Sequence, residues 1–329
     1  MAFTVGTPYS GSVPNPAYSG TFIPEIWSGK LIEKFYDATV IGAIANTNYE
    51  GEIKNHGDKV IIRTKPSISI AAYTAEQALA VTRPSSNVVE LNIDKGYYWN
   101  TVLDDVMEVQ SDLNQMSMWA DDASEQMKIQ IDTEVLAYMA TDMVTLDTGD
   151  DNHNTTAGRI SSNINLGDPT ATTGVSVAIV AKGETGAQRN AIDFILDMGQ
   201  VLDEQNIPET GRWLILPSWY ATRIKKSELR DASLTGDGTS MLRNGRLGVI
   251  DRFTIYSSNL LPTGTSSGSV TSTKIFAGHS HGMTFASQLS KVETLRAEST
   301  FGTLLRGLQV YGRKVIDYRS IAMGVVHPA

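Results

Sequence analysis

The chain of 329 residues has 27 Lys and Arg against 36 Asp and Glu, a net charge of −9, and no cysteine. The lack of cysteine excludes disulfide scaffolds, thiolate zinc sites, cysteine nucleophiles and iron–sulfur clusters. The acidic balance argues against a protein that binds nucleic acid by neutralising phosphates, because that mode needs clustered Lys and Arg. The length permits a substantial core, since a compact fold of this size buries about 75% of its unfolded surface.

The N-terminal region changes from an extended to a helical pattern. Residues 4–21 contain prolines among Gly, Ser and Thr and no charge, which predicts an extended arm that is not stable alone. The apolar spacing of residues 24–45 then predicts a short amphipathic helix. We expect neither a signal peptide nor a membrane span, because no apolar run approaches the roughly 20 residues that a span needs. The expectation is a soluble, cytoplasmic chain.

Two runs rich in β-branched residues, 59–64 and 88–94, predict the strands of a long hairpin. The segment between them is interpreted as a polar tip, and Pro66 and Pro84 make it a poor helix and a poor central strand. A hairpin of this length is marginal without its own core. We expect it to rest on the remainder of the chain or on another chain.

The strongest periodic signal runs from Val106 to Tyr138, where apolar residues recur every three or four positions. It predicts an amphipathic helix over 111–140, about 45 Å long, with Ser111 and Asp112 as a fresh N-terminus. The stripe consists of Ala and Met more than of Leu and Ile, which favours a helix lying across a sheet. A coiled coil is the alternative.

The helical region also carries the charge asymmetry of the chain. Residues 101–155 contain 13 acidic residues and one base, Lys128. A solvated helix face is the ordinary explanation of such a run, although the near-absence of Lys is unusual.

The second half of the chain alternates helices and strands. Residues 187–205 predict a helix, 213–216 a buried strand, and Pro217 the start of a second helix that continues to 229. Further strands are expected at 249–256, 274–277 and 292–297, and within the closing run 308–326. The order predicts an α+β or α/β module at about 186–288.

One motif matches a nucleophile elbow. Residues 278–282 read G-H-S-H-G, and Asp317 and His327 follow Ser280 in the chain order of a hydrolase triad. An elbow must lead into a helix, however, whereas residues 283–287 alternate as a strand does. We therefore predict a strand-to-strand turn, and a serine hydrolase that uses Ser280 remains an alternative.

No other residue pattern predicts a site. His279 and His281 lack a third metal ligand at short spacing, and Asp147-Thr148-Gly149 lacks the second triplet of an aspartic protease. Neither a Walker A motif nor G-x-G-x-x-G occurs. Two further candidates are discounted. The acids Asp147, Asp150 and Asp151 lack calcium-loop spacing and are interpreted as a turn. The basic cluster of Arg223, Lys225, Lys226 and Arg230 is interpreted as helix-surface ion pairs. We predict no catalytic, cofactor-binding or metal site.

The order of these parts resembles the major capsid (coat) protein of tailed bacteriophages with the Hong Kong 97-type fold. The stretches that carry the resemblance are the hairpin of 49–98 with the helix ending IDTEVL (131–136), GRWLILPSWY (211–220) followed by NGRLGVIDRFTIYSSNLLP (244–262), and FGTLLRGLQVYGRKVI (301–316). Each stretch alone is weakly specific, but their order and spacing cover nearly the whole chain.

The resemblance implies an α+β phage major capsid fold. Its parts would be an N-terminal arm (1–48), an extended β-hairpin loop (49–98), a peripheral domain with a long spine helix and a β-sheet (99–185), a mixed α/β axial domain (186–288), and a return to the peripheral domain (289–329). Some relatives cross-link a loop lysine to a neighbouring subunit. Lys54, Lys59 and Lys65 lie in the hairpin, but no matching Asn and acid pair is identified.

The implied function is structural and not enzymatic. Subunits would form hexamers and pentamers that close into an icosahedral virion shell around double-stranded DNA, bound without sequence specificity. The implied partners are other copies of the chain, a separate scaffolding protein and a portal protein, with room for a decoration protein and no membrane. Synthesis and assembly would take place in the cytoplasm of the bacterial host. An encapsulin-type compartment, which encloses protein cargo, is the alternative within the same fold.

The acidic segment suggests a hypothesis about the packaged DNA. If the spine helix faces the interior, its carboxylates repel DNA within the screening length of about 8 Å and keep it from adhering to the wall. Replacing Asp121, Asp122 and Glu125 by Lys should then increase salt-sensitive DNA binding to the shells. An unchanged DNA affinity across a salt series would defeat the hypothesis.

Overall fold

The computed structural model describes most of the chain from residue 36 onward, within one unit of residues 35–329. The described residues are 36–37, 39–49, 59–63, 66, 68–75, 77–79, 81, 83–84, 88–110, 115–146, 164–167, 176–186, 188–227, 248–266, 270–298 and 300–329. Three predicted features lie outside these residues: the arm, most of the helix of 24–45, and the Asp147-Thr148-Gly149 triplet.

The architecture is α+β, as predicted, and its larger sheet has eight strands. These strands are β4 (Val177–Val180), β5 (Gln188–Asn190), β6 (Arg212–Leu216), β7 (Val249–Ile250), β8 (Phe253–Ser257), β9 (Thr263–Ser266), β10 (Val270–His279) and β13 (Ile321–Pro328). Their order is β5-β4-β13-β10-β6-β8-β7, with β9 paired to β10. The pairs β4–β5, β4–β13 and β6–β8 are parallel, and the others are antiparallel, so the sheet is mixed.

The centre of this sheet matches the sequence prediction. All five residues of β6 are buried, the predicted apolar run of 213–216 together with the charged Arg212. Helix α5 (Ala191–Glu204) buries one apolar face, and the Asn190 side chain caps its first turn by accepting the Ile192 N–H at 3.2 Å. Helix α6 (Ser218–Lys226) begins directly after Pro217, which occupies the N-cap.

A second sheet has three antiparallel strands in the order β11-β12-β3. They are long: β3 spans Lys95–Asp104, β11 spans Met283–Arg296 and β12 spans Gly302–Val315. The short helix α3 (Asp105–Gln110) follows β3, and the 3₁₀ turn η2 (Tyr318–Ser320) joins β12 to β13. The ladder between β11 and β12 runs over nearly the whole length of both strands, with one irregularity between Ser287 and Leu289.

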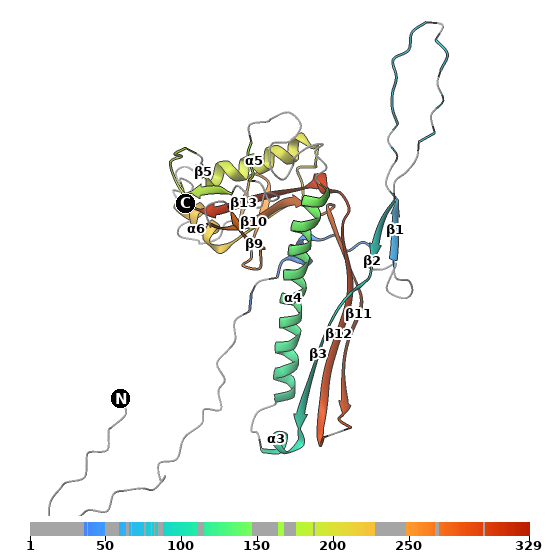
Figure 1. The fold of residues 1–329 in the computed structure, drawn as a ribbon, viewed down its shortest axis with the longest axis vertical. Helices are drawn as coiled ribbons and strands as arrows, with labels where there is room; N and C mark the ends of the chain where they lie inside the picture. Colours follow the sequence, from blue (N-terminus) through green and yellow to red (C-terminus); the bar gives the residue numbers. More distant parts are fainter. Residues whose placement is uncertain are drawn as a thin grey trace, which may run out of the picture. The chain divides into compact units, whose positions relative to one another are not determined.

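The predicted long helix is α4 (Gln115–Leu146), and it packs against β12 and β3 as a helix on a sheet (Figure 1). Ser111 and Asp112, where a fresh N-terminus is expected, lie outside the described residues; α3 ends at Gln110 and α4 begins at Gln115. Burial differs from the predicted stripe, because none of residues 116–130 is buried, whereas Ile131, Val135 and other residues to Met143 are. The second half of α4 therefore joins the main core, which also includes residues of α5, β6, β10 and β13.

The hairpin is present as β1 (Lys59–Arg63) and β2 (Val88–Asn92), paired antiparallel with Lys59 opposite Asn92. Upstream of it, residues 39–49 contain the four-residue helix α1 (Ile41–Ile44). The predicted helix of 24–45 is thus described only at its end. None of the described helices is both long and apolar enough to cross a membrane.

One strand prediction needs correction. The expected strand of 249–256 is a hairpin, because Asp251 and Arg252 adopt positive φ values of 45° and 66° and reverse the chain between β7 and β8. The strands predicted within the closing run belong to two sheets: β12 pairs with β11 and β3, whereas β13 pairs with β10 and β4 in the larger sheet. β4 and β13 therefore share the larger sheet with β6.

Candidate assembly surfaces

The G-H-S-H-G segment forms the turn between β10 and β11, as predicted, and does not enter a helix. His327 lies far from Ser280: Gly278 pairs with Ile321, whereas Thr273 pairs with Val326, on the order of 17 Å further along the strand. His327 Nδ1 instead lies 2.8 Å from the Ser176 hydroxyl. The three residues of the hypothetical triad are therefore not brought together.

The side chain of His279 has a structural role in this turn. His279 Nδ1 accepts the backbone N–H of His281 at 3.1 Å, and burial lowers the pKa of His279, which keeps its ring neutral. His279, Ser280 and His281 line a shallow cavity of about 320 Å³ together with residues 45–48. In the described part of the chain no group of three or more potential metal ligands occurs.

The basic cluster on α6 is also accounted for by structure. Arg223 donates to the backbone oxygen of Ala329 at 2.6 Å and so ties α6 to the end of β13. Lys225 and Lys226 stand in the last turn of α6, where they complement the helix dipole. Arg230 lies outside the described residues.

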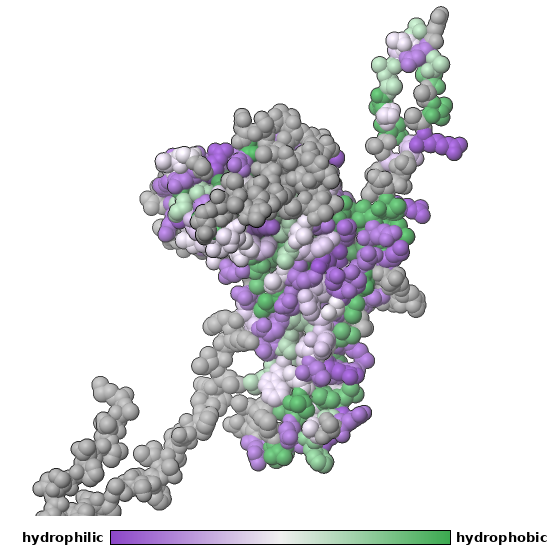
Figure 2. Space-filling model, in the orientation of Figure 1, coloured by the Kyte–Doolittle hydropathy of each residue, from purple (hydrophilic) through white to green (hydrophobic). Residues whose placement is uncertain are grey.

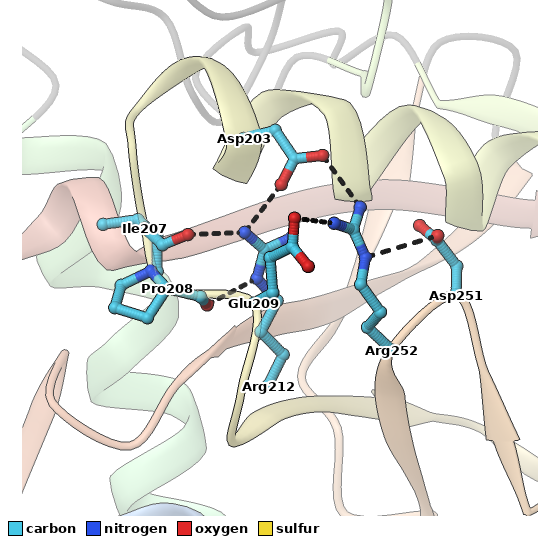
Figure 3. Close-up of polar contacts among 7 residues, drawn as sticks. All are labelled: Asp203, Ile207, Pro208, Glu209, Arg212, Asp251 and Arg252. Carbon is cyan, nitrogen blue, oxygen red and sulfur yellow. Dashed lines mark hydrogen bonds and ion pairs between the residues drawn. The ribbon is translucent and has the colours of Figure 1, made fainter.

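An ion cluster joins the end of α5 to β6 and to the β7–β8 turn (Figure 3). Asp203 accepts from Arg212 Nη2 at 2.7 Å and from Arg252 Nη2 at 2.8 Å. The guanidinium of Arg212 is buried and also donates to the backbone oxygens of Ile207 and Pro208. Burial acts to raise the pKa of Asp203, but the two arginines outweigh it and lower that pKa. The cluster fixes the turn that carries the positive φ of Arg252.

Replacing Asp203 by Asn is expected to lower the free energy of unfolding by about 1–2 kcal/mol. The buried Arg212 loses its carboxylate, but the 41% exposure of the Asp203 side chain lets water screen part of the loss. Chemical denaturation of the unassembled subunit measures the effect. Glu209→Gln, which changes a 69% exposed partner of Arg252, is the matched control and should cost under about 0.5 kcal/mol. Equal losses in the two variants would contradict the role of the buried arginine.

A second polar cluster holds α4 on β12. Glu134 accepts from the Tyr311 hydroxyl at 2.5 Å and from Arg313 Nε at 3.0 Å, and it also pairs with Arg313 Nη2. The Arg313 guanidinium stacks on the Tyr138 ring, 3.8 Å from its centroid. Because Tyr311 is fully buried and the Arg313 side chain is 9% exposed, the cluster lies largely out of water. It fixes the rotation of α4 about its axis.

The hairpin has a packed root. Val60, Ile62 and Leu91 are buried and form a small core with Ala286 of β11. Lys59 Nζ lies 3.4 Å from Glu90 Oε1 across the hairpin, while Lys54 and Lys65 lie outside the described residues. The expected support for the hairpin is thus supplied at its root by the chain itself.

The tip of the hairpin is not polar, which corrects the prediction. The described tip carries exposed apolar side chains, and hydrophobic residues are visible along it in Figure 2. They are Ile68 (71% exposed), Ile70 (97%), Tyr73 (68%), Leu79 (77%) and Val81 (93%). Exposed apolar side chains gathered on one appendage are typical of an interaction surface.

The three-stranded sheet also has an open face, on the side away from α4. Tyr98 (79% exposed) and Leu308 (39%) pair across β3 and β12, and Val102 (50%) follows four residues further along β3. Between them, Glu293 pairs with both Arg306 and Lys291. At the far end of the sheet the exposed apolar residues are Phe301, Val106 and Val109. The open face of the sheet, the apolar residues at its far end and the hairpin tip are therefore three candidate surfaces for contacts with other subunits.

Many of the acids of 101–155 have partners within the subunit. Asp105 pairs with Arg296, Glu125 with Lys128 and Asp142 with Lys314. Other contacts involve Asp104, Asp122, Asp132 and Glu134. Asp121 is exposed. The acidity of this segment therefore serves internal contacts as well as a solvated face.

Comparison with models of known protein families identifies one matching family. The model of a family described as phage capsid protein matches residues 100–324, more than half of the chain. A search of curated protein sequences with this chain finds no match.

Solved structures share the fold. A chain of Mycobacterium phage Che8 is 24% identical with a TM-score of 0.71, and the match covers 93% of this chain and 98% of that one. The capsid of cyanophage P-SCSP1u is 14% identical with a TM-score of 0.66, covering 94% of both chains. The capsid of a native GTA particle is 13% identical with a TM-score of 0.60, covering 97% of this chain and 100% of that one. The fold, its long helix and sheet, its exposed apolar appendage and the family match agree: the chain belongs to the phage capsid protein family.

Proposed function

We propose that this structural major capsid protein assembles as hexamers and pentamers into an icosahedral shell around double-stranded DNA. The observation that carries the proposal is the hairpin tip, whose apolar side chains are exposed on an appendage with a packed root. Burying such a side chain on a neighbouring subunit contributes about 1.5–3 kcal/mol, against the cost of association. Closed rotational symmetry repeats the same contact around each capsomer.

We also propose how the parts of the fold correspond to capsid domains. The eight-stranded sheet with α5 and α6 is the axial domain, and α4 with the three-stranded sheet is the peripheral domain. Residues 49–98 are the extended loop, and residues 1–48 are the N-terminal arm. Sheet membership is the basis of this division, so β4 and β13, which lie outside 186–288 but pair within the eight-stranded sheet, are assigned to the axial domain.

The remaining partners are proposed by family membership. A separate scaffolding protein directs shell closure, a portal protein occupies one vertex, a decoration protein has room on the outer surface, and DNA is enclosed without sequence-specific binding. The virion is the proposed location of the mature protein, after assembly in the cytoplasm of the bacterial host. The family match does not favour an enzyme or a protein-filled compartment.

Sedimentation velocity of the purified protein over a concentration series tests the proposal, with negative-stain electron microscopy of every fast fraction. Shells, tubes or curved sheets with hexameric texture are the expected result. A compact globular monomer or dimer at every concentration would contradict it.

The tip itself is tested by the double substitution Ile70→Glu and Val81→Glu. Both side chains are more than 90% exposed, so the fold should be unchanged by circular dichroism, while burial of two charges should weaken each contact by several kcal/mol and abolish fast fractions. The matched control, Ile70→Leu with Val81→Leu, keeps the apolar character and should assemble. Normal assembly of the glutamate variant would exclude the tip as a contact surface.

A further inference from the structure

The segment 39–49, here called the strap, is held on α4 by one buried carboxylate. Asp132 is 5% exposed, and its Oδ2 accepts the backbone N–H groups of Val40 at 2.5 Å and of Ile41 at 3.3 Å. These groups stand at the start of α1, where a helix offers its N–H groups no internal acceptor. Val40, at the N-cap, has an apolar side chain and cannot cap them. Asp132 therefore supplies the cap from a residue 92 positions away.

The middle of the strap is packed and then paired. Ile41 and Ile44 are buried in the main core. Asn46 forms a parallel bridge with Thr284 at the start of β11. Three hydrogen bonds support this bridge, from Asn46 N–H to Met283 O at 2.8 Å, from Phe285 N–H to Asn46 O at 3.1 Å, and from the Thr284 hydroxyl to Asn46 O at 2.9 Å.

The end of the strap reaches the root of the hairpin. Tyr49 packs against the small core formed by Val60, Ile62, Leu91 and Ala286. Ala286 stands two residues after Thr284, so one short stretch of β11 contacts both the strap and the hairpin root. In Figure 1 the strap, in blue, leads past α4 toward β1 and β2. A continuous chain of contacts thus runs from Asp132 to the hairpin.

We propose that Asp132 is a positioning residue for the hairpin: by holding the strap on α4, it makes α4, the strap and the hairpin root one rigid unit. The direction in which the apolar tip leaves the subunit is then set by a contact on α4, and not by the hairpin root alone. Loss of the contact releases the strap and loosens the root while the two sheets stay folded. The coupling is a property of one subunit and is independent of assembly.

The buried position of Asp132 requires a side chain that can accept hydrogen bonds. Burial raises the pKa of Asp132, and the two backbone N–H groups partly counteract this. A buried carboxylate without donors is costly, and buried N–H groups without an acceptor are costly too, so each side satisfies the other only when the strap is docked. A side chain without an acceptor would leave both N–H groups unpaired. Any movement of the strap that breaks these bonds while either side stays buried is therefore unfavourable.

Hydrogen exchange of the unassembled full-length chain tests the coupling. Asp132→Ala should speed exchange of the strap amides roughly 5- to 30-fold, the factor for a lost cap, and should also speed exchange at 59–63 and 88–92 of the hairpin root. Asp132→Asn keeps an acceptor and should stay near wild type. Asp121→Ala, an exposed acid on the same helix, is the matched control and should change neither segment.

Two outcomes would overturn the proposal. Faster exchange in the strap with an unchanged hairpin root would show that Asp132 caps α1 without positioning the hairpin. Unchanged exchange in the strap would show that Asp132 does not stabilise the strap at all.

Exchange of the β6 amides reports global unfolding. If Asp132→Ala unfolds the subunit, the variant Thr284→Val tests the coupling in its place. It removes the hydrogen bond from the Thr284 hydroxyl to Asn46 O and leaves no buried charge unpaired. It should loosen both strap and root, and loosening of neither or of the strap alone would refute the coupling.

Discussion

Replacing Glu134 by Gln is expected to lower the free energy of unfolding by about 3 kcal/mol. The substitution preserves shape but leaves the guanidinium of Arg313, 9% exposed, without its anion. It also weakens the acceptor of the buried Tyr311 hydroxyl. Removing one partner of a buried ion pair costs a few kcal/mol because the other charge stays desolvated. Denaturant unfolding at pH 7 measures the loss.

The pH dependence of this loss separates charge from packing. Burial acts to raise the pKa of Glu134, but the hydrogen bonds from Arg313 and Tyr311 outweigh it, so the pKa is lowered in the folded state. A lowered folded pKa gives stability that is present above the unfolded value of about 4.3 and is lost as the pH falls through the folded value. The difference between wild type and Glu134→Gln should therefore shrink below about pH 4.

Asp121→Asn is the control for this experiment, because it removes an exposed carboxylate from the same helix. It should change the unfolding free energy by less than about 0.5 kcal/mol at pH 7. A Glu134→Gln loss as small as that of the control, or one that is independent of pH, would contradict the role assigned to the Glu134 cluster.

Elements encoded by local patterns were predictable. The buried run of β6, the Pro217 boundary and the apolar face of α5 each depend on residues within one or two turns of each other, and all three are confirmed. The order of the hairpin, long helix and later strands was sufficient for the family resemblance. The order of the elements along the chain therefore identified the family better than any single motif did.

Pairing between distant strands was not predictable from local patterns. β13 is apolar on both faces and could pair in either sheet by composition, and it is placed beside β10 and β4 by packing across the whole subunit. The reversal at Asp251 and Arg252 lacks the glycine that usually signals positive φ, and the Arg252 contacts with Asp203 and Glu209 compensate for it.

The assembly surfaces were predicted only in part. The hairpin was found, but its tip was interpreted as polar because Pro, Ser and Thr dominate its ends, whereas the alternation of Ile68 with Ile70 and of Leu79 with Val81 was the available signal of an apolar face. The roles of Asp132 and Glu134 had no local signal. Their partners stand 92 and about 180 positions away, so a solvated helix face was the natural interpretation.

Gly312→Ala is the second substitution with a large expected effect, about 2–3 kcal/mol of lost stability. A Cβ at this position of β12 would collide with the backbone oxygen of Asn92 and would meet Ile93 Cδ1 at 2.6 Å. A backbone atom cannot rotate away as a side chain does, so β12 must separate from Asn92, the last residue of β2, and from the segment that links β2 to β3. That segment joins the hairpin to the sheet, and we expect assembly to suffer together with stability.

Gly96→Ala is the matched control within the same sheet. Its Cβ would find its nearest neighbours, Gln309 O and Val310 Cγ2, at 3.6 Å, which is ordinary contact, so stability should stay within about 0.5 kcal/mol or rise slightly. Denaturant unfolding and sedimentation velocity of both variants make the comparison. Equal behaviour of the two would show that β12 and the hairpin junction adapt freely. A loss confined to Gly312→Ala would show that their close contact determines where the hairpin leaves the sheet.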